Sequence, residues 1–389
     1  MKRTILVLSA LLLTVFSFGQ NFEKPQLDSI EFTKVKVKVG ADFALQLQNL
    51  NHEAPNSTAP LVDLKNNFNL PTANLSVTAN LAPGIQLYIN NFMSSRHHNE
   101  AWVEGGYLII DKLPFLPGTD KLMENFTIKA GVYSPDYGDS HYYRSNNAAV
   151  LSNPFVGNWI MDSYTTNPGL EIMYRNNGII AEVGTNNGRL NYGRGGNLGE
   201  DLVFNWKVGY DKQLNEDLRV RATASGYHVP EGHSGSYLWG GDRAGARYYS
   251  VMDTVGGDNF RSGRWDPGSG QTKMTAIQGA LFVQFQGLEV FGFYETMSGV
   301  SRGNDQNYSQ IGAQLKYNIK SFYVAGRYNM VDNNAGSTVS RINLGGGWFM
   351  TPNVLVKLDY VTQSYMGAAH GHLDGGKFNG FVIEAAIGF

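Results

Sequence analysis

The sequence predicts an all-β fold, a transmembrane antiparallel β-barrel of about 16 strands with long extracellular loops and short periplasmic turns. Three observations predict it. Apolar and polar residues alternate along many segments of the 389-residue chain. The connections between those segments are alternately short and long. Aromatic residues make up 12% of the chain and charged residues only 16%, a composition that favours strands over helices.

Residues 1–19 are predicted to be a secretory signal peptide. A short basic start precedes an apolar run from Ile5 to Phe16, and small residues follow at the positions that a signal peptidase reads. A membrane anchor is the alternative, but the run is shorter than the ~20 apolar residues that span a bilayer. We expect residues 20–34 to form a short periplasmic segment and residues 35–389 to form the barrel.

Sixteen segments show the period-two alternation of a strand with one apolar face. In the first, the odd positions from Val35 to Leu47 are apolar, and the even positions carry mainly Lys, Gln, Gly and Asp. A transmembrane strand needs ~9–11 residues, a length close to that of the segments. The predicted strands are 35–50, 74–82, 85–94, 101–111, 126–133, 168–175, 179–186, 202–211, 218–227, 272–286, 288–297, 309–319, 322–331, 339–350, 354–364 and 378–389.

The connections support a barrel in an outer membrane. Starting from the first segment, every second connection is usually short, such as Gly287 or Lys320–Ser321. The connections between these are mostly longer: 51–73, 134–167, 187–201, 228–271 and 365–377. The exceptions are a long turn at 112–125 and short loops at 95–100 and 332–338. Short turns on one side and long loops on the other are typical of outer-membrane barrels.

Aromatic residues gather at the ends of the predicted strands, on their apolar faces. Tyr317 and Trp348 precede short turns, whereas Tyr294 and Tyr328 lie near the other end. Two levels of rings fit the aromatic girdles at the membrane interfaces, although the core of a soluble β-sandwich is the alternative. The last segment alternates up to Phe389, a pattern typical of the barrels that the outer-membrane assembly machinery recognises. Pairing this segment with the first one would remove the sheet edges.

The composition argues against several other functions. The net charge of −2 gives no reason to expect nucleic acid as a partner. Without cysteine there is no disulfide, thiolate metal site or lipoprotein anchor. His97–Glu100 and His370–His372 lack the spacing of a metal site, so no metal and no cofactor are predicted. Asp139, Ser140 and His141 are consecutive and cannot form a catalytic triad by themselves, so the protein is not predicted to be an enzyme.

Several polar and aromatic stretches stand out between Ile85 and Asp162. They are Leu87–Ile89, Ser95–Val103, Gly105–Leu108, Tyr137–Asn147 and Asn153–Asp162. This part of the chain, about a fifth of its length, resembles the phosphate-selective porin O/P-like family, in the version widespread in Bacteroidetes-type outer membranes. The resemblance implies a homotrimeric porin of sixteen strands whose third long loop, 134–167, folds into the lumen. The family's arginine ladder and lysine clusters are reduced here to the pair Arg219 and Arg221.

Charged side chains are predicted to line the lumen, because a Lys or Arg facing lipid costs ~2–4 kcal/mol at mid-membrane. We expect a constriction in which four residues of loop 134–167 face a basic pair on the opposite wall, with further basic residues, Lys273 included, along the lumen. The predicted constriction and pore-lining residues are Asp136, Asp139, His141 and Arg144 opposite Arg219 and Arg221, together with Lys36, Lys38, Lys207 and Arg327. The alternatives are charges that only pair across strands and a loop that packs on its extracellular neighbours.

The predicted function is that of an outer-membrane porin in a Gram-negative bacterium. It would allow passive diffusion of small hydrophilic solutes or ions, with a weak preference for anions such as phosphate. The expected partners are outer-membrane lipid, the solutes and two further copies of the chain. One alternative is a non-conducting barrel that serves as a scaffold, an adhesin or a partner of a secretion or uptake machine, with its lumen filled by loops. A barrel hydrolase is a further alternative.

Overall fold

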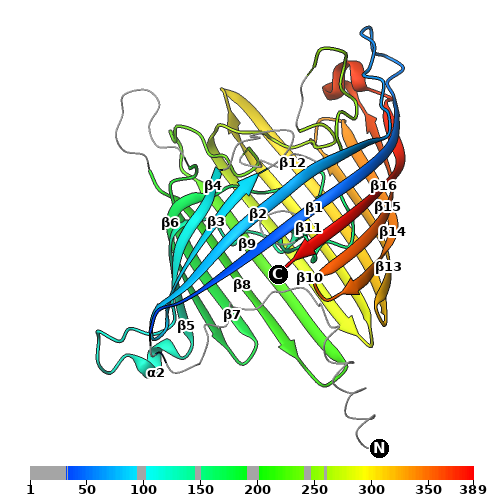
Figure 1. The fold of residues 1–389 in the computed structure, drawn as a ribbon. Helices are drawn as coiled ribbons and strands as arrows, with labels where there is room; N and C mark the ends of the chain where they lie inside the picture. The colour runs from blue at the N-terminus through cyan, green and yellow to red at the C-terminus, as the bar shows by residue number, and fades with distance from the viewer. Residues whose placement is uncertain are drawn as a thin grey trace, which may run out of the picture.

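The computed structural model describes residues 32, 34–93, 102–144, 150–190, 201–240, 247–257 and 261–389. Within these ranges the chain forms a closed barrel of sixteen strands (Figure 1). Each strand pairs antiparallel with its neighbours in sequence, and β1 pairs with β16 to close the barrel. The predicted fold class is confirmed. The predicted signal peptide and almost all of residues 20–34 lie outside the described residues.

All sixteen predicted strand segments are strands. The strands are β1 (Lys36–Glu53), β2 (Asn67–Ala82), β3 (Ile85–Met93), β4 (Trp102–Ile110), β5 (Phe126–Tyr133), β6 (Asn167–Asn176), β7 (Ile179–Asn186), β8 (Val203–Gln213), β9 (Leu218–Val229), β10 (Gln271–Phe285), β11 (Leu288–Ser301), β12 (Asn304–Ile319), β13 (Phe322–Asp332), β14 (Thr338–Thr351), β15 (Val354–Met366) and β16 (Lys377–Gly388). In the described ranges, short helical segments lie in the connections: α2 (Asp120–Met123), η1 (Ser140–Tyr143) and η2 (Ala368–Leu373), the last with a kink at Gly371. None of the helices in the described ranges is long and apolar enough to cross a membrane.

Two strands begin earlier than the alternation predicts. β2 starts at Asn67 and β12 at Asn304. The added start of β12 is polar, whereas in β2 Phe68 and Leu70 alternate with asparagines before Pro71 and Thr72 interrupt the pattern. β11 and β12 continue past the apolar band as a hairpin whose two-residue turn holds Arg302 and Gly303 at positive φ (51° and 80°). Because both faces of this extension are polar, period-two apolar spacing could not reveal it.

The alternation divides the barrel wall into an apolar outer face and a polar inner face. Leu315 and Leu344 point outward and are 54% and 55% exposed, whereas Gln314 points inward and is 3% exposed. Lys273 corrects one inward assignment. The Lys273 side chain lies on the same face as the outward Ile277 and Leu281, and its Nζ is 2.7 Å from Glu231 near the end of the strand. The register shift between Gln271 and Lys273 instead leaves Gln271 on the inner face.

Substituting Leu344 with arginine tests the outer face directly. Leu344 lies four positions before the girdle residue Trp348, so it faces the middle of the apolar band. We expect Leu344→Arg to destabilise the membrane-inserted barrel by about 2–4 kcal/mol, measured by denaturant titration in lipid vesicles. The matched control is Met350→Arg, also outward and 52% exposed but at the strand end, where the cost is about 0–1 kcal/mol. Equal costs at both positions would contradict a lipid-facing band.

Two connections fold into the barrel and pack against its inner face. L3 is the connection 134–166 and L5 is the connection 230–270; their residues 145–149, 241–246 and 258–260 lie outside the described ranges. From L3, Tyr137, Ile160 and Met161 join a buried apolar cluster with Trp239 and Tyr248 of L5. The strands contribute inward residues to the same cluster, namely Val203, Tyr227, Met274, Met297, Val331, Val361, Phe378 and Val382. Much of the lumen is therefore occupied by side chains.

Candidate functional site

The first part of L3 is held against β8 and β9 by charge. The Lys207 ammonium on β8 contacts Asp136 and lies 3.1 Å from Asp139. The Arg221 guanidinium on β9 donates to both oxygens of Asp139, at 2.7 and 3.0 Å, and to Asp211 at 3.0 Å. Burial raises the pKa of the Asp139 carboxyl, but Lys207 and Arg221 outweigh it and hold that pKa below its usual range.

The backbone of L3 also sits close to this wall. The Gly138 N–H donates to the Ser225 hydroxyl at 2.9 Å, and the Asp139 N–H donates to the Gln278 side-chain oxygen at 2.8 Å. Gly138 has φ of +71°, and a Cβ there would lie 2.7 Å from the Gln278 amide. Only glycine fits this position without strain.

The second part of L3 is bound to another part of the barrel wall, across the lumen from β8 and β9. Arg144 donates to Asp162 in a two-pronged ion pair of 2.7 to 3.0 Å, with its guanidinium 4.0 Å from the centre of the Tyr164 ring. The Ile160 N–H donates to Asn329 at 2.7 Å on β13, and the Arg327 guanidinium lies 4.1 Å from the Trp159 ring centre. L3 therefore crosses the lumen and contacts strands on both sides.

The predicted constriction residues are distributed differently from the expectation. Asp139 and Arg221 do not face each other across a gap but are in direct contact. Arg144 does not face the basic pair, because it is bound to Asp162 within L3. Arg219 pairs with Asp211 at 2.9 Å, closer to the short-turn end than Arg221.

The other predicted pore residues lie in three places: at the rim on the short-turn side, on the strand wall against L3, and within L3 itself. Lys36 and Lys38 lie at the start of β1, before Asp42, where the pairing with β16 begins, so they sit at the rim on the short-turn side. Arg327 is buried against L3 and donates to Gln314 at 2.6 Å. His141 has Nδ1 3.2 Å from the Tyr137 carbonyl oxygen, and burial lowers its pKa to about 4, so its ring is neutral at pH 7.

Several of the buried lumen charges form ion pairs across strands. Lys316 lies 3.2 Å from Glu289, Lys357 lies 2.8 Å from Glu384, and Lys129 lies 3.4 Å from Glu171. These contacts favour the interpretation in which many inward charges stabilise the barrel. They leave a smaller set of polar side chains that line open space.

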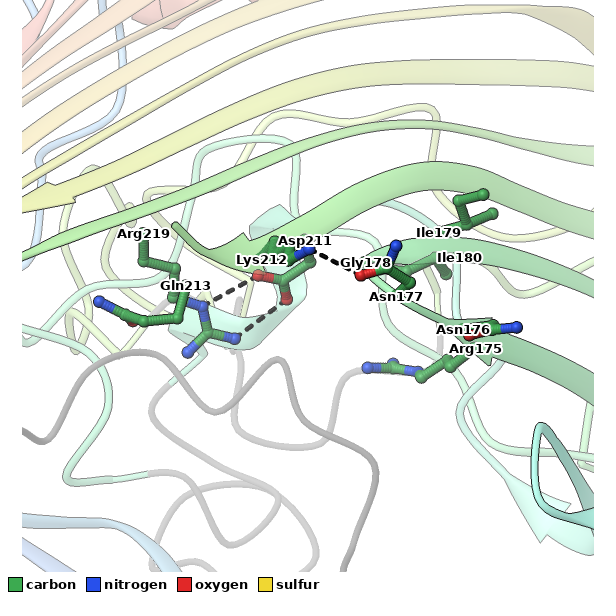
Figure 2. Close-up of a pocket in the computed structure, with 10 residues that line it drawn as sticks. All are labelled: Arg175, Asn176, Asn177, Gly178, Ile179, Ile180, Asp211, Lys212, Gln213 and Arg219. Atoms are coloured by element: carbon green, nitrogen blue, oxygen red, sulfur yellow. Dashed lines mark hydrogen bonds and ion pairs between the residues drawn. The ribbon is translucent and has the colours of Figure 1, made fainter. Parts of the chain in front are cut away.

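A cavity of about 280 Å³ opens at the short-turn end, between the β6–β7 turn and the ends of β8 and β9 (Figure 2). Three basic side chains, Arg175, Lys212 and Arg219, and one carboxylate, Asp211, line it. Figure 2 shows the Arg219 guanidinium directed at Asp211, with Arg175 apart from them. We call this space the mouth cavity.

A second cavity, of about 170 Å³, lies between L3 and strands β3 to β5. We call it the tyrosine cavity. Its lining residues are Tyr88, Asn90, Glu104, Gly105, Tyr107, Lys129, Val132, Tyr133, Ser134, His141 and Thr166. Of these residues, only His141 is among those predicted from the sequence to form the constriction. The alternation could have identified some of the others, because Tyr88 and Tyr133 fall on the polar face of their strands.

Neither a metal centre nor a catalytic triad is assembled in the part of the chain that the structure describes. That part contains no group of three His, Asp or Glu residues able to hold a metal ion. His370 packs on Trp265 with ring centres 4.4 Å apart, and His97–Glu100 lies outside the described residues. Ser140 accepts from the Gln278 amide at 3.1 Å, and Asp139 is bound to Arg221, so these two do not form a relay with His141.

A closed barrel of sixteen antiparallel strands, with a long loop packed inside, is the fold of outer-membrane porins. One similar structure is the anion-selective porin from Comamonas acidovorans, with 12% identity over 92% of this chain and 100% of that chain (TM-score 0.56). Two others are the trimer form of the outer membrane protein OmpT of Vibrio cholerae (13% identity, 91% and 99% covered, TM-score 0.54) and the outer membrane channel DcaP of Acinetobacter baumannii (11% identity, 92% and 99% covered, TM-score 0.53).

These likenesses concern the fold, since the identities are 11–13%. No protein-family model and no curated protein matches the sequence. The similar structures support a porin-like barrel in general and do not single out the phosphate-selective O/P-like family.

Proposed function

We propose that the protein is an outer-membrane porin through which small hydrophilic solutes diffuse passively. The observation that carries the proposal is the division of one closed wall into two faces. Leucine, isoleucine, valine and aromatic side chains cover the outside. Charged and amide side chains line the inside, except where inward apolar residues of the strands pack against L3 and L5. Such a wall is stable in lipid and keeps water within, which is the physical requirement for a diffusion pore.

The two cavities indicate where the solute path would run. The mouth cavity lies at the short-turn end, and the tyrosine cavity lies deeper, between L3 and β3 to β5. L3 is fastened by ion pairs to β8 and β9. We therefore propose that solutes pass along the β3–β5 wall, with the narrowest point beside Lys129 and His141, and not between Asp139 and Arg221.

A weak anion preference is part of this proposal. Three basic side chains and one carboxylate line the mouth cavity, and a low-dielectric wall focuses their field on passing ions. The preference is weak because the deeper charges are largely neutralised by their partners. We further propose export by an N-terminal signal peptide and assembly as a homotrimer, which the trimer form of the Vibrio protein supports by analogy of fold.

A second candidate function has one observation in its favour. L3 and L5 fill much of the lumen with an apolar cluster, as expected of a non-conducting barrel that serves as a scaffold, an adhesin or a partner of a secretion or uptake machine. The two candidates differ in a single measurable property, the passage of ions.

Planar-bilayer recording separates them. We expect the purified barrel to give step-like increases in conductance, and a salt gradient to give a reversal potential on the anion-selective side. Arg175→Gln removes one of the mouth charges and is expected to move the reversal potential toward zero. The control is Lys377→Gln, half-exposed at the long-loop end and 2.9 Å from Glu53, which is expected to leave it unchanged. Folded protein that inserts without conductance steps would favour the non-conducting barrel.

A further inference from the structure

The tyrosine cavity has the size of a binding site for one small solute. Its volume is about 170 Å³, which suits a single hexose and excludes a chain of sugars. L3 contributes Ser134, His141 and Thr166, and the facing wall contributes side chains from three adjacent strands, β3, β4 and β5. A solute on the path proposed above would meet this cavity at the loop.

Three tyrosine rings from three neighbouring strands line the cavity wall. The ring centres of Tyr88 and Tyr107 are 5.2 Å apart, and those of Tyr107 and Tyr133 are 6.2 Å apart, with the second pair nearly perpendicular. Aromatic faces pack against the apolar C–H faces of ring-shaped solutes, while their hydroxyls remain available for hydrogen bonds.

Two buried hydroxyl groups of the lining have no hydrogen-bond partner among the described residues. They belong to Tyr133, 1% exposed, and Thr166, 4% exposed. Both oxygens have almost no exposed surface, so a solute reaches them only when the side chains that line the cavity shift. A buried hydroxyl without a partner is costly, so a solute that offers its own hydroxyls gains a hydrogen bond from such a shift. This pattern fits a ligand rich in both donors and acceptors.

The lining of the cavity carries one charge of each sign, and each has its own polar partners. Lys129 supplies one ammonium and Glu104 one carboxylate. The Lys129 ammonium is 3.4 Å from Glu171, and Glu104 accepts hydrogen bonds from Asn74 at 2.9 Å, Asn90 at 2.6 Å and Tyr164 at 2.7 Å. His141 is neutral at pH 7 because burial lowers its pKa to about 4. A neutral solute matches this lining better than a strongly charged one.

We propose that the tyrosine cavity is a binding subsite for an uncharged, hydroxyl-rich solute of monosaccharide size, which slows and selects such solutes as they pass L3. The inference rests on the proposed porin function and adds the class of solute. The aromatic faces, Lys129, Glu104 and the Tyr133 hydroxyl belong to the strand wall, and the Thr166 hydroxyl belongs to the facing L3.

The test uses the full-length protein in planar bilayers with glucose as the probe. Glucose is expected to reduce the chloride current in a saturable way. Tyr133→Phe and Thr166→Val each remove one hydroxyl at nearly constant volume and should raise the half-blocking concentration about fivefold, the effect of one hydrogen bond. The matched control is Tyr143→Phe, a buried L3 tyrosine that packs on Trp159 and Phe291 outside the cavity and should leave the block unchanged.

The possible failures are distinguishable. Chloride current without glucose block, or an equal loss of block in Tyr143→Phe, would overturn the subsite and leave the porin intact. Block by inorganic phosphate at lower concentration than glucose would also overturn it, in favour of an anion site. If no variant conducts, the porin proposal fails. Calorimetric titration of the detergent-solubilised barrel with glucose then decides the subsite by itself, with the same variants and control.

Discussion

Replacing Arg221 with alanine is expected to make the channel more permeable to cations. Arg221 is fully buried and neutralises Asp139 on L3 and Asp211 on β8 together. Its removal leaves two carboxylates facing the lumen with less positive charge beside them, and breaking one side of a buried ion pair costs about 3–5 kcal/mol. The start of L3 should loosen from β9 while the barrel wall stays closed.

The measurement is the reversal potential under a potassium chloride gradient, together with the rate at which added protease cuts L3. We expect a shift toward cation selectivity and faster cleavage. Arg221→Lys keeps the charge but loses the two-pronged geometry, so it should fall between wild type and alanine. Arg302→Ala, exposed in the β11–β12 turn, is the control without effect. An unchanged potential and cleavage rate would mean that the Arg221 pairs neither face the ion path nor hold the loop.

Glu384→Gln is expected to give the largest loss of stability. The Glu384 carboxylate on β16 accepts from Arg247 of L5, from Lys357 at 2.8 Å and from Gln46 of β1 at 2.9 Å, and its side chain has no exposed surface. The amide keeps the shape but leaves two buried cations without a counter-charge. The expected cost is about 3–5 kcal/mol, visible as a lower temperature for the shift from folded to unfolded mobility on a detergent gel.

The pairing of β1 with β16, the seam of the barrel, also supplies a matched control. Glu53 of β1 pairs with Lys377 of β16 at 2.9 Å, but both side chains are at least half exposed. Glu53→Gln should therefore cost less than about 1 kcal/mol. Adding Lys357→Met to Glu384→Gln should recover part of the loss, because one of the two stranded cations is then removed. Equal effects of Glu384→Gln and Glu53→Gln would contradict the assigned role of burial.

The barrel could be predicted from the sequence because period-two spacing is a local property. Leu344 and Trp348 reveal an outer face without reference to any other strand. Strand ends beyond the apolar band, such as that at Asn304, carry no such pattern. A bulge also defeats it, since the register shift before Lys273 leaves Gln271 buried inside although Gln271 and the exposed Lys273 are two positions apart.

The site was less predictable because its contacts join residues far apart in the sequence. Asp139 and Arg221 are 82 positions apart, and either could have faced open water. Asp139 and Arg221 were expected to face each other across open space, but L3 packs on the barrel wall and brings them into a direct ion pair. By contrast, the inward position of Tyr88 and Tyr133 follows from strand parity. The alternation along a strand does not reveal which strands contact L3.

The pairing of β1 with β16 has a consequence for assembly. Every other ladder joins strands that follow each other along the chain, so these hairpins can form in order with short loop closures. The seam joins Asp42 to Gly388, and nearly the whole polypeptide lies between them. The entropic cost of closing the barrel is therefore concentrated in one late step. Until β1 and β16 pair, these two edge strands have unpaired backbone N–H and C=O groups. An assembly factor that covers β1 and β16 before they pair would act at the slowest step of barrel folding.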